Sequence, residues 1–178
     1  PPSPRLPKPM EDALSVLRKQ GVKVAHYIMT RLPPPLPCCT CCNSYANITK
    51  MVDRALSAYP DDSIFYDNGP FAHTESLYLP LYTYARNWGG RQREVLFNSE
   101  WTTFEEIYLT NTSAIMMAYE GYGSTIEGTT TNPSKFDWST FPSARFAMCI
   151  ENVTSAADAI KVVQKGTALH FGSFFITS

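Results

Sequence analysis

The feature of this sequence that most constrains its fold is a regular alternation of strand-like and helix-like segments. Strands are expected where β-branched and aromatic residues cluster, and helices where apolar residues recur every three or four positions. The expected strands are residues 22–29, 63–66, 94–97, 114–119, 144–150 and 170–177, and the expected helices are 10–20, 43–59, 75–88, 102–109 and 154–165. This order predicts an α/β fold with a central, largely parallel sheet and flanking helices.

Local signals place several of the element boundaries. Ser155 and Asp158 are a plausible cap for the last helix, and Gly166 is expected to end it. The tetrapeptide Asp67-Asn68-Gly69-Pro70 predicts a turn directly after the second strand. Pro80 predicts a kink or a late start in the helix that follows.

Two proline-rich stretches divide the chain. Residues 1–9 contain five prolines and are expected to form an extended polyproline arm. Residues 33–42 are expected to form a stiff Pro/Cys-rich connector within a single domain that spans 10–178. The apolar strand 170–177 and the arm are both suited to pack against a neighbouring copy of the chain.

The charge pattern excludes some partners. Charged residues make up 17% of the chain and the net charge is −1, so the basic stripe that nucleic acid requires is missing. No run of 18 apolar residues is present, so no membrane span is expected. The chain begins at Pro1 without a signal peptide, which we interpret as an already processed form. A surface with few charges is expected to be covered by glycans, by subunit contacts or by both.

Three Asn-X-Ser/Thr sequons begin at Asn47, Asn111 and Asn152. Each can accept an N-linked glycan, so the sequence predicts a secreted, extracellular glycoprotein. The similar tripeptide Asn132-Pro133-Ser134 is excluded, because proline in its middle position blocks glycosylation.

The chain has five cysteines: Cys38, Cys39, Cys41, Cys42 and Cys149. The first four are too crowded for a typical tetrahedral zinc site, so we expect disulfides and no metal. Adjacent cysteines bridge only with strain, and the odd count leaves one sulfur for a free thiol or an intermolecular bond.

The candidate catalytic residues each have a structural interpretation as well. His73 and Glu75 lie near Asp61, Asp62 and Asp67, which suggests either a carboxylate-rich site at the end of a strand or a solvated turn before a helix. The structural interpretation is favoured.

No other motif indicates catalysis. His26 and His170 are expected to pack within apolar strands, and Gly121-Tyr122-Gly123-Ser124 lacks the spacing of a dinucleotide fingerprint. Ser139, Ser143 and Ser173 lack the context of a hydrolase nucleophile. The sequence therefore predicts no catalytic, cofactor or metal residues.

One stretch nevertheless resembles a known enzyme family. Trp101-Thr102-Thr103-Phe104, Tyr108 and the strand Ile115-Met116-Met117 are similar to the tryptophan-led helix and following strand of the secreted ADP-ribosyl cyclase/NAD glycohydrolase family. Ile64-Phe65-Tyr66 and Ser139-Thr140-Phe141 fit the same order, so the resemblance covers about residues 60–163.

This resemblance implies NAD chemistry in a cleft near Tyr66, Glu94 and Trp101. The family's Thr-Leu-Glu motif is replaced by Arg93-Glu94-Val95, and the position of its catalytic glutamate falls near Arg145. An arginine there would repel a developing positive charge, so the resemblance implies a copy that has lost the chemistry.

The first functional hypothesis is therefore a secreted, N-glycosylated, non-enzymatic structural protein that self-assembles as a filament, wall or sheath subunit. Its expected contacts use the N-terminal arm and the C-terminal strand, and the abundant tyrosines and tryptophans suit an interface. The alternatives are a secreted enzyme that processes NAD or another nucleotide, and a secreted effector or carbohydrate-binding module.

Overall fold

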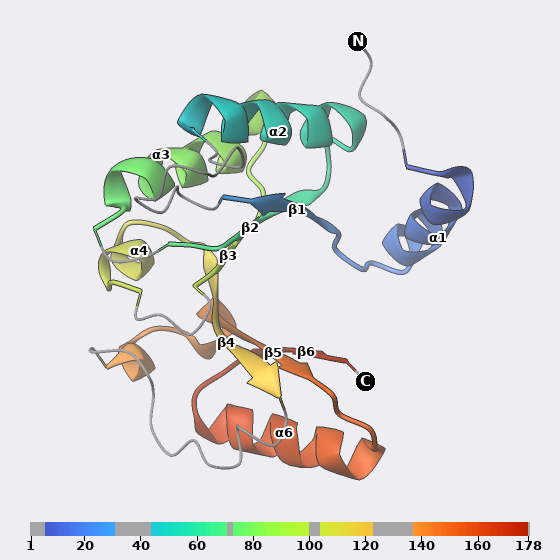
Figure 1. Ribbon diagram of the computed structural model, residues 1–178, viewed down its shortest axis with the longest axis vertical. Helices are drawn as coiled ribbons and strands as arrows, with labels where there is room; N and C mark the ends of the chain where they lie inside the picture. Colours follow the sequence, from blue (N-terminus) through green and yellow to red (C-terminus); the bar gives the residue numbers. More distant parts are fainter. Residues whose placement is uncertain (1–5, 31–43, 71–72, 100–103, 123–136, 178) are drawn as a thin grey trace, which may run out of the picture.

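The computed structural model describes residues 6–30, 44–70, 73–99, 104–122 and 137–177 (Figure 1). Within these ranges helices and strands alternate as the sequence predicts. The helices are Lys8–Lys19 (α1), Tyr45–Ala58 (α2), Glu75–Arg86 (α3), Ile107–Thr110 (α4) and Ala156–Ala168 (α6), with 3₁₀ turns at Trp88–Gly90, Trp138–Thr140 and Ser143–Arg145. The strands are Ala25–Met29 (β1), Ser63–Asp67 (β2), Val95–Asn98 (β3), Ile115–Tyr122 (β4), Phe146–Glu151 (β5) and Ser173–Ile176 (β6).

The six strands form one parallel sheet in the order β1-β2-β3-β4-β5-β6, which confirms the predicted α/β class. Because each strand lies beside its predecessor and parallel crossovers are right-handed, the connecting helices fall on one face of the sheet. The sheet curves, with α2, α3 and α6 on its outer side (Figure 1). The same arrangement, with sequential parallel strands inside and their connecting helices outside, closes into a barrel when eight strands are present.

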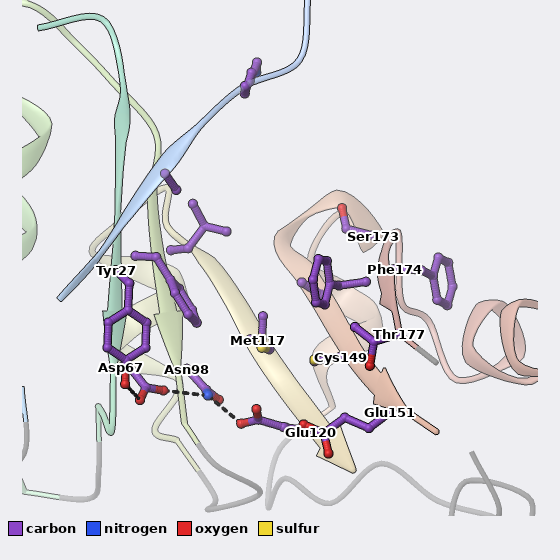
Figure 2. Close-up of a pocket in the computed structure, with 16 residues that line it drawn as sticks. Tyr27, Asp67, Asn98, Met117, Glu120, Cys149, Glu151, Ser173, Phe174 and Thr177 are labelled. Atoms are coloured by element: carbon purple, nitrogen blue, oxygen red, sulfur yellow. Dashed lines mark hydrogen bonds between the residues drawn. The ribbon is translucent and has the colours of Figure 1, made fainter. Parts of the chain in front are cut away.

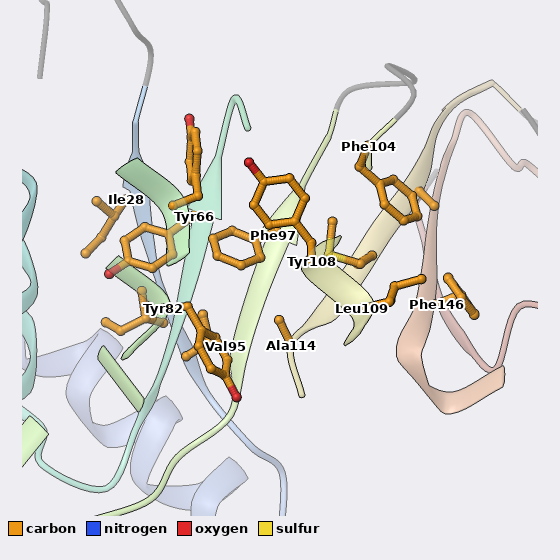
Figure 3. Packing of buried hydrophobic residues seen from close by; sticks show 14 of the residues in the cluster. Ile28, Tyr66, Tyr82, Val95, Phe97, Phe104, Tyr108, Leu109, Ala114 and Phe146 are labelled. Carbon is orange, nitrogen blue, oxygen red and sulfur yellow. The ribbon is translucent and has the colours of Figure 1, made fainter. Parts of the chain in front are cut away.

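The hydrophobic core lies between the outer face of the sheet and these helices (Figure 3). Tyr66 and Phe97 stack there with ring centroids 5.6 Å apart, and Tyr78 meets Phe97 edge-on at 5.8 Å. Burial raises the pKa of Tyr66, whose hydroxyl donates to the carbonyl of Leu81. Alternate residues of each strand supply this core, so the residues between them point to the inner face.

Strand β4 contains a bulge that changes which residues face inward. Met117 pairs with Ala147, but the next pairs are Tyr119 with Met148 and Glu120 with Cys149, which leaves Ala118 as the extra residue. With strict alternation from Met117, Glu120 would point to the outer face. The bulge therefore places a carboxylate on the inner face, a role that bulges often have beside functional sites.

Helix α1 is fastened to the amino end of the sheet. Arg18 makes two hydrogen bonds to Asp62, which is 4% exposed, and Asp62 also accepts one from His26 Nε2 at 2.9 Å. The His26 ring stacks on Tyr59 at 5.2 Å, and the Tyr59 hydroxyl contacts Glu11 of α1 at 3.2 Å. Asp62 raises the pKa of Arg18 mainly through these hydrogen bonds.

Some predicted boundaries are wrong. The last helix does not stop at Gly166 but continues to Ala168. The chain leaves the helix through His170, whose backbone has a left-handed conformation with φ 73°. Gly166 is needed for packing, because a Cβ there would lie 2.4 Å from the Phe174 ring. The expected helix 102–109 is the single turn Ile107–Thr110 in the described residues, and β4 continues through Gly121 and Tyr122, which were expected to be loop. The cap of α6 is confirmed, since the Ser155 side chain accepts from the Asp158 amide.

The proline-rich stretches are described only in part. Residues 1–5 and the connector 33–42 lie outside the described residues, whereas Lys8 and Pro9 of the expected arm already belong to α1. The Leu6 amide donates to the Tyr59 hydroxyl at 3.2 Å. In the part of the chain that the structure describes, none of the helices is long and apolar enough to cross a membrane.

Candidate functional site

Polar side chains from four neighbouring strands meet at the carboxyl end of the sheet (Figure 2). We call Tyr27, Asp67, Asn98 and Glu120 the carboxyl-end cluster. The Asn98 amide nitrogen donates to Asp67 Oδ1 at 2.8 Å and to Glu120 Oε2 at 2.6 Å. Tyr27 donates its hydroxyl to Asp67 Oδ2 at 2.5 Å, and Asn68 Nδ2 donates to the same oxygen at 2.8 Å. The cluster thus holds two carboxylates in fixed positions on neutral donors.

The turn after β2 fixes the position of Asp67. Thr30 Oγ1, fully buried, donates to the Asp67 carbonyl at 2.7 Å and contacts Tyr78 Oη at 2.8 Å. The Gly69 amide donates to the Asn98 carbonyl at 2.8 Å. A Cβ at Gly69 would lie 1.9 Å from Tyr78 Oη, so only glycine allows the turn to pass this close to the tyrosine.

The cluster opens on a cavity of about 740 Å³ along the inner face of the sheet. Apolar side chains such as Phe65, Leu96 and Met117 line its middle. Tyr27 of β1 and Phe175 of β6 also line it, and these two residues are 55% and 59% exposed. A mostly apolar hollow with a few convergent polar groups is the usual form of a small-molecule site.

Two further residues of β5 face the same cavity. Cys149, which is 7% exposed, and Glu151 line it beside Glu120, with Cys149 directly opposite Glu120 in the sheet register. Burial, aided by the charges of Glu120 and Glu151, raises the pKa of the Cys149 thiol to about 11. The thiol therefore stays protonated near neutral pH.

The acids that the sequence grouped near His73 are separated by the fold. Asp67 joins the carboxyl-end cluster, whereas Asp61 and Asp62 lie at the opposite end of the sheet, before β2. Asn98 and Glu120 were not predicted, since the sequence does not show which strands are neighbours or where β4 bulges. The one available signal was the position of polar residues at the ends of apolar strands.

His73 and Glu75 lie instead beside Glu105, with one ligand atom of each residue within 4.8 Å of the others. Glu75 and Glu105 share a hydrogen bond, which lowers the pKa of Glu75 and raises that of Glu105. The His73 side chain is 91% exposed, with Nδ1 3.8 Å from Glu105 Oε1. This surface group does not line the cavity.

The other candidate residues have structural contacts. His170, which was expected within a strand, precedes β6, and its Nε2 lies 2.7 Å from the Phe141 carbonyl. His26 belongs to β1 and contacts Asp62, and neither histidine hydrogen-bonds to a serine among the described residues. Ser173 lines the cavity. Gly121 and Tyr122 end β4, while Gly123 and Ser124 lie outside the described residues.

Tyr66 and Glu94, to which the enzyme resemblance points, do not meet in one cleft. Tyr66 is fully buried on the outer face, and Glu94 lies at the amino end of β3, where it pairs with Lys23 at 2.5 Å. Arg145 donates to the Ala114 carbonyl at 2.6 Å, a structural role. Trp101 lies outside the described residues.

The three sequon asparagines, Asn47, Asn111 and Asn152, are all exposed. Cys149 is buried and has no disulfide partner among the described residues. Its four possible partners, Cys38, Cys39, Cys41 and Cys42, lie outside the described residues, so disulfide formation stays a prediction.

Comparisons with known proteins show a likeness in fold. No protein-family model matches the chain, and no curated protein matches it. Among solved structures, the crystal structure of Aspergillus clavatus Sph3 in complex with GalNAc is similar, with a TM-score of 0.59 and 16% sequence identity. The match covers 99% of this chain and 85% of the Sph3 chain. At this identity the two proteins are similar in fold alone.

Proposed function

We propose that this chain is a carbohydrate-binding protein and that the carboxyl-end cluster is its sugar site. The observation that carries the proposal is the series Asp67–Asn98–Glu120, held on neutral donors at the edge of the cavity. Carboxylates accept strong hydrogen bonds from hydroxyl groups, and the exposed Tyr27 ring offers a flat apolar surface beside them. The fold likeness to a protein crystallised with GalNAc supports a sugar as the ligand.

The test is calorimetric titration of the purified protein with GalNAc, galactose and short oligosaccharides that contain them. Glu120→Gln keeps the size of the side chain but removes the charge that accepts hydroxyl hydrogens, so affinity should fall about tenfold or more. Glu94→Gln is the matched control, because Glu94 lies at the amino end of the sheet and pairs with Lys23. Absence of sugar binding by the unaltered protein, or equal losses in both variants, would contradict the proposal.

A second candidate function, hydrolysis of a glycosidic bond, is favoured by the spacing of the two carboxylates. Because Asp67 and Glu120 accept hydrogen bonds from the same Asn98 nitrogen, their bonded oxygens lie about 4–5 Å apart. Retaining glycosidases hold their two carboxyl groups about 5 Å apart, one as nucleophile and one as acid/base. Asp67, with its three donors, suits the nucleophile, and Glu120 suits the proton donor.

Release of reducing ends from a bound oligosaccharide would test this activity. Hydrolysis should be lost in Asp67→Asn and Glu120→Gln and kept in Glu94→Gln. Binding without any release by the unaltered protein would leave a binding protein and rule out the enzyme.

Secretion, N-glycosylation and self-assembly remain proposals. The exposure of Asn47, Asn111 and Asn152 supports glycosylation, which a mass shift on treatment with an endoglycosidase would test. Strand β6 is an edge of the sheet and carries the exposed Phe175, which supports pairing with another copy. Light scattering at high protein concentration would test assembly, and a strictly monomeric particle would contradict it.

A further inference from the structure

The sugar site is rich in carboxylates from three strands. Asp67, Glu120 and Glu151 face the carboxyl end of the cavity from β2, β4 and β5 (Figure 2). Glu120 lies opposite Cys149 in the sheet register, and Glu151 follows Cys149 by two residues on the same face. Both glutamates act on the thiol of Cys149, whose pKa they raise together with burial. Asp67 is connected to Glu120 through the Asn98 amide, so the three acids lie at the same end of the cavity.

These carboxylates have no cationic partner among the described residues. The donors to Asp67 are a tyrosine hydroxyl and two amides, and Glu120 accepts from the Asn98 amide. The Glu151 carboxylate has neither a hydrogen bond nor an ion pair within the described part of the chain. Lys23, the one described cation that lines the cavity, precedes β1 at the opposite end and pairs with Glu94.

The carboxylates are too dispersed for one bare metal ion. Their oxygens do not come within 4.8 Å of one another as a set of three, unlike those of the His73 group. A divalent cation needs its oxygens about 2–2.6 Å away on several sides at once. A cationic group that is part of a larger, otherwise neutral molecule fits this spacing better than a bare metal ion does.

From this arrangement we infer that the site selects sugars with a free, protonated amine over their N-acetylated forms. The inference rests on the proposed carbohydrate binding and names the class of sugar that this site prefers. An ammonium group donates three hydrogens and carries the positive charge that the three carboxylates do not receive from the described residues, whereas an acetamido group is neutral. The ligand class is an oligosaccharide of unacetylated hexosamine units.

The experiment compares a fully deacetylated and a fully N-acetylated oligomer of the same hexosamine by calorimetry. At about 0.01 M salt the deacetylated oligomer should bind at least about fivefold more tightly, and at about 1 M salt the difference should largely vanish through screening. Glu151→Gln should reduce the preference about threefold, because it removes one of the charges that attract the ammonium group. Glu106→Gln, which removes a charge that does not line the cavity, should leave the preference intact.

The outcomes separate the two proposals. If neither oligomer binds, the proposed carbohydrate binding fails. If both bind with equal affinity, or the acetylated oligomer binds more tightly, carbohydrate binding stands and the selection for amines is overturned. A preference that Glu106→Gln reduces as much as Glu151→Gln does would show general attraction to an acidic protein, which also overturns the inference.

Discussion

The two ends of the parallel sheet carry the same kinds of acidic side chain in opposite surroundings. At the amino end Asp62 lies between Arg18 and His26, Asp61 pairs with Arg91, and Glu94 pairs with Lys23. At the carboxyl end Asp67 and Glu120 have hydroxyl and amide donors.

This difference separates the acids that stabilise the fold from the acids that can bind a ligand. A carboxylate such as Asp62, which is bonded to Arg18 and His26, has little attraction left for a ligand, and its bonds to Arg18 hold α1 against the sheet. A carboxylate whose partners are neutral donors has no cation beside it to offset its attraction for a ligand. Parallel sheets also bind their ligands at the carboxyl ends of their strands. The distribution of ion pairs and the strand topology therefore both indicate that the binding site lies at the carboxyl end of the sheet.

The largest expected effect comes from Gly69→Ala, which should damage the carboxyl end in both stability and binding. The added methyl would overlap Tyr78 Oη, and Tyr78 cannot retreat because it is fully buried and bonded to Thr30 and to the Asn68 carbonyl. We expect the free energy of unfolding to fall by about 2–3 kcal/mol, as for other overpacked sites. Sugar affinity should fall too, because Asp67 moves with the turn. Urea unfolding and calorimetry measure the two effects.

Gly89→Ala provides the comparison for that variant. Gly89 has φ 63° with open space around its Cβ position, so alanine there meets only the cost of the left-handed backbone, about 1 kcal/mol. Sugar affinity should not change. If Gly69→Ala behaved like Gly89→Ala, the close approach to Tyr78 would not be what positions Asp67.

A smaller effect, confined to stability, is expected from Asp62→Asn at the amino end. Removing the buried charge leaves Arg18 and His26 without their carboxylate, and breaking a buried pair costs about 3–5 kcal/mol. Because the Arg18 side chain is 29% exposed, we expect about 2 kcal/mol in urea unfolding. Sugar affinity should be retained, which is the reverse of the result for Glu120→Gln.

Asp61→Asn is the control for this prediction, because it removes an exposed acid at the same end of the sheet. The Asp61 side chain is 80% exposed, so its pair with Arg91 should contribute no more than about 1 kcal/mol. A loss of sugar binding in Asp62→Asn would mean that the two ends of the sheet are coupled and that the division between them is wrong.

Much of the fold could be predicted from the sequence, because hydrophobic periodicity reports local structure directly. The six strands and the α/β class followed from apolar runs such as Ile64–Tyr66, whose residues are buried or half-buried in the structure. Boundaries failed where a tertiary contact outweighs local preference. Gly166 ends a helix by its intrinsic preference, yet the Phe174 ring occupies the space beside it and the helix continues.

The site was not predicted. Asp67 was named beside a possible carboxylate-rich site at the end of a strand, but its structural interpretation as part of a solvated turn was favoured. Asn98 and Glu120 were not named, because their role depends on β2, β3 and β4 lying side by side and on the bulge at Ala118. Neither the strand order nor a bulge leaves a periodic signal in one sequence, so residues that meet through them become visible only in three dimensions.

The smallest expected effect concerns the Cys149 thiol, which senses the charge at the carboxyl end. Its pKa of about 11 reflects burial first and then the negative charges of Glu120 and Glu151, so alkylation by iodoacetamide at about pH 8 should be slow. Glu151→Gln removes one negative charge, which favours the thiolate, lowers the pKa and should raise the alkylation rate a few-fold. Asp61→Asn, at the other end of the sheet, should leave the rate unchanged. Mass spectrometry of the peptide that contains Cys149 distinguishes this thiol from the other four cysteines. If Glu151→Gln left the alkylation rate unchanged, the charge of Glu151 would not act on the Cys149 thiol.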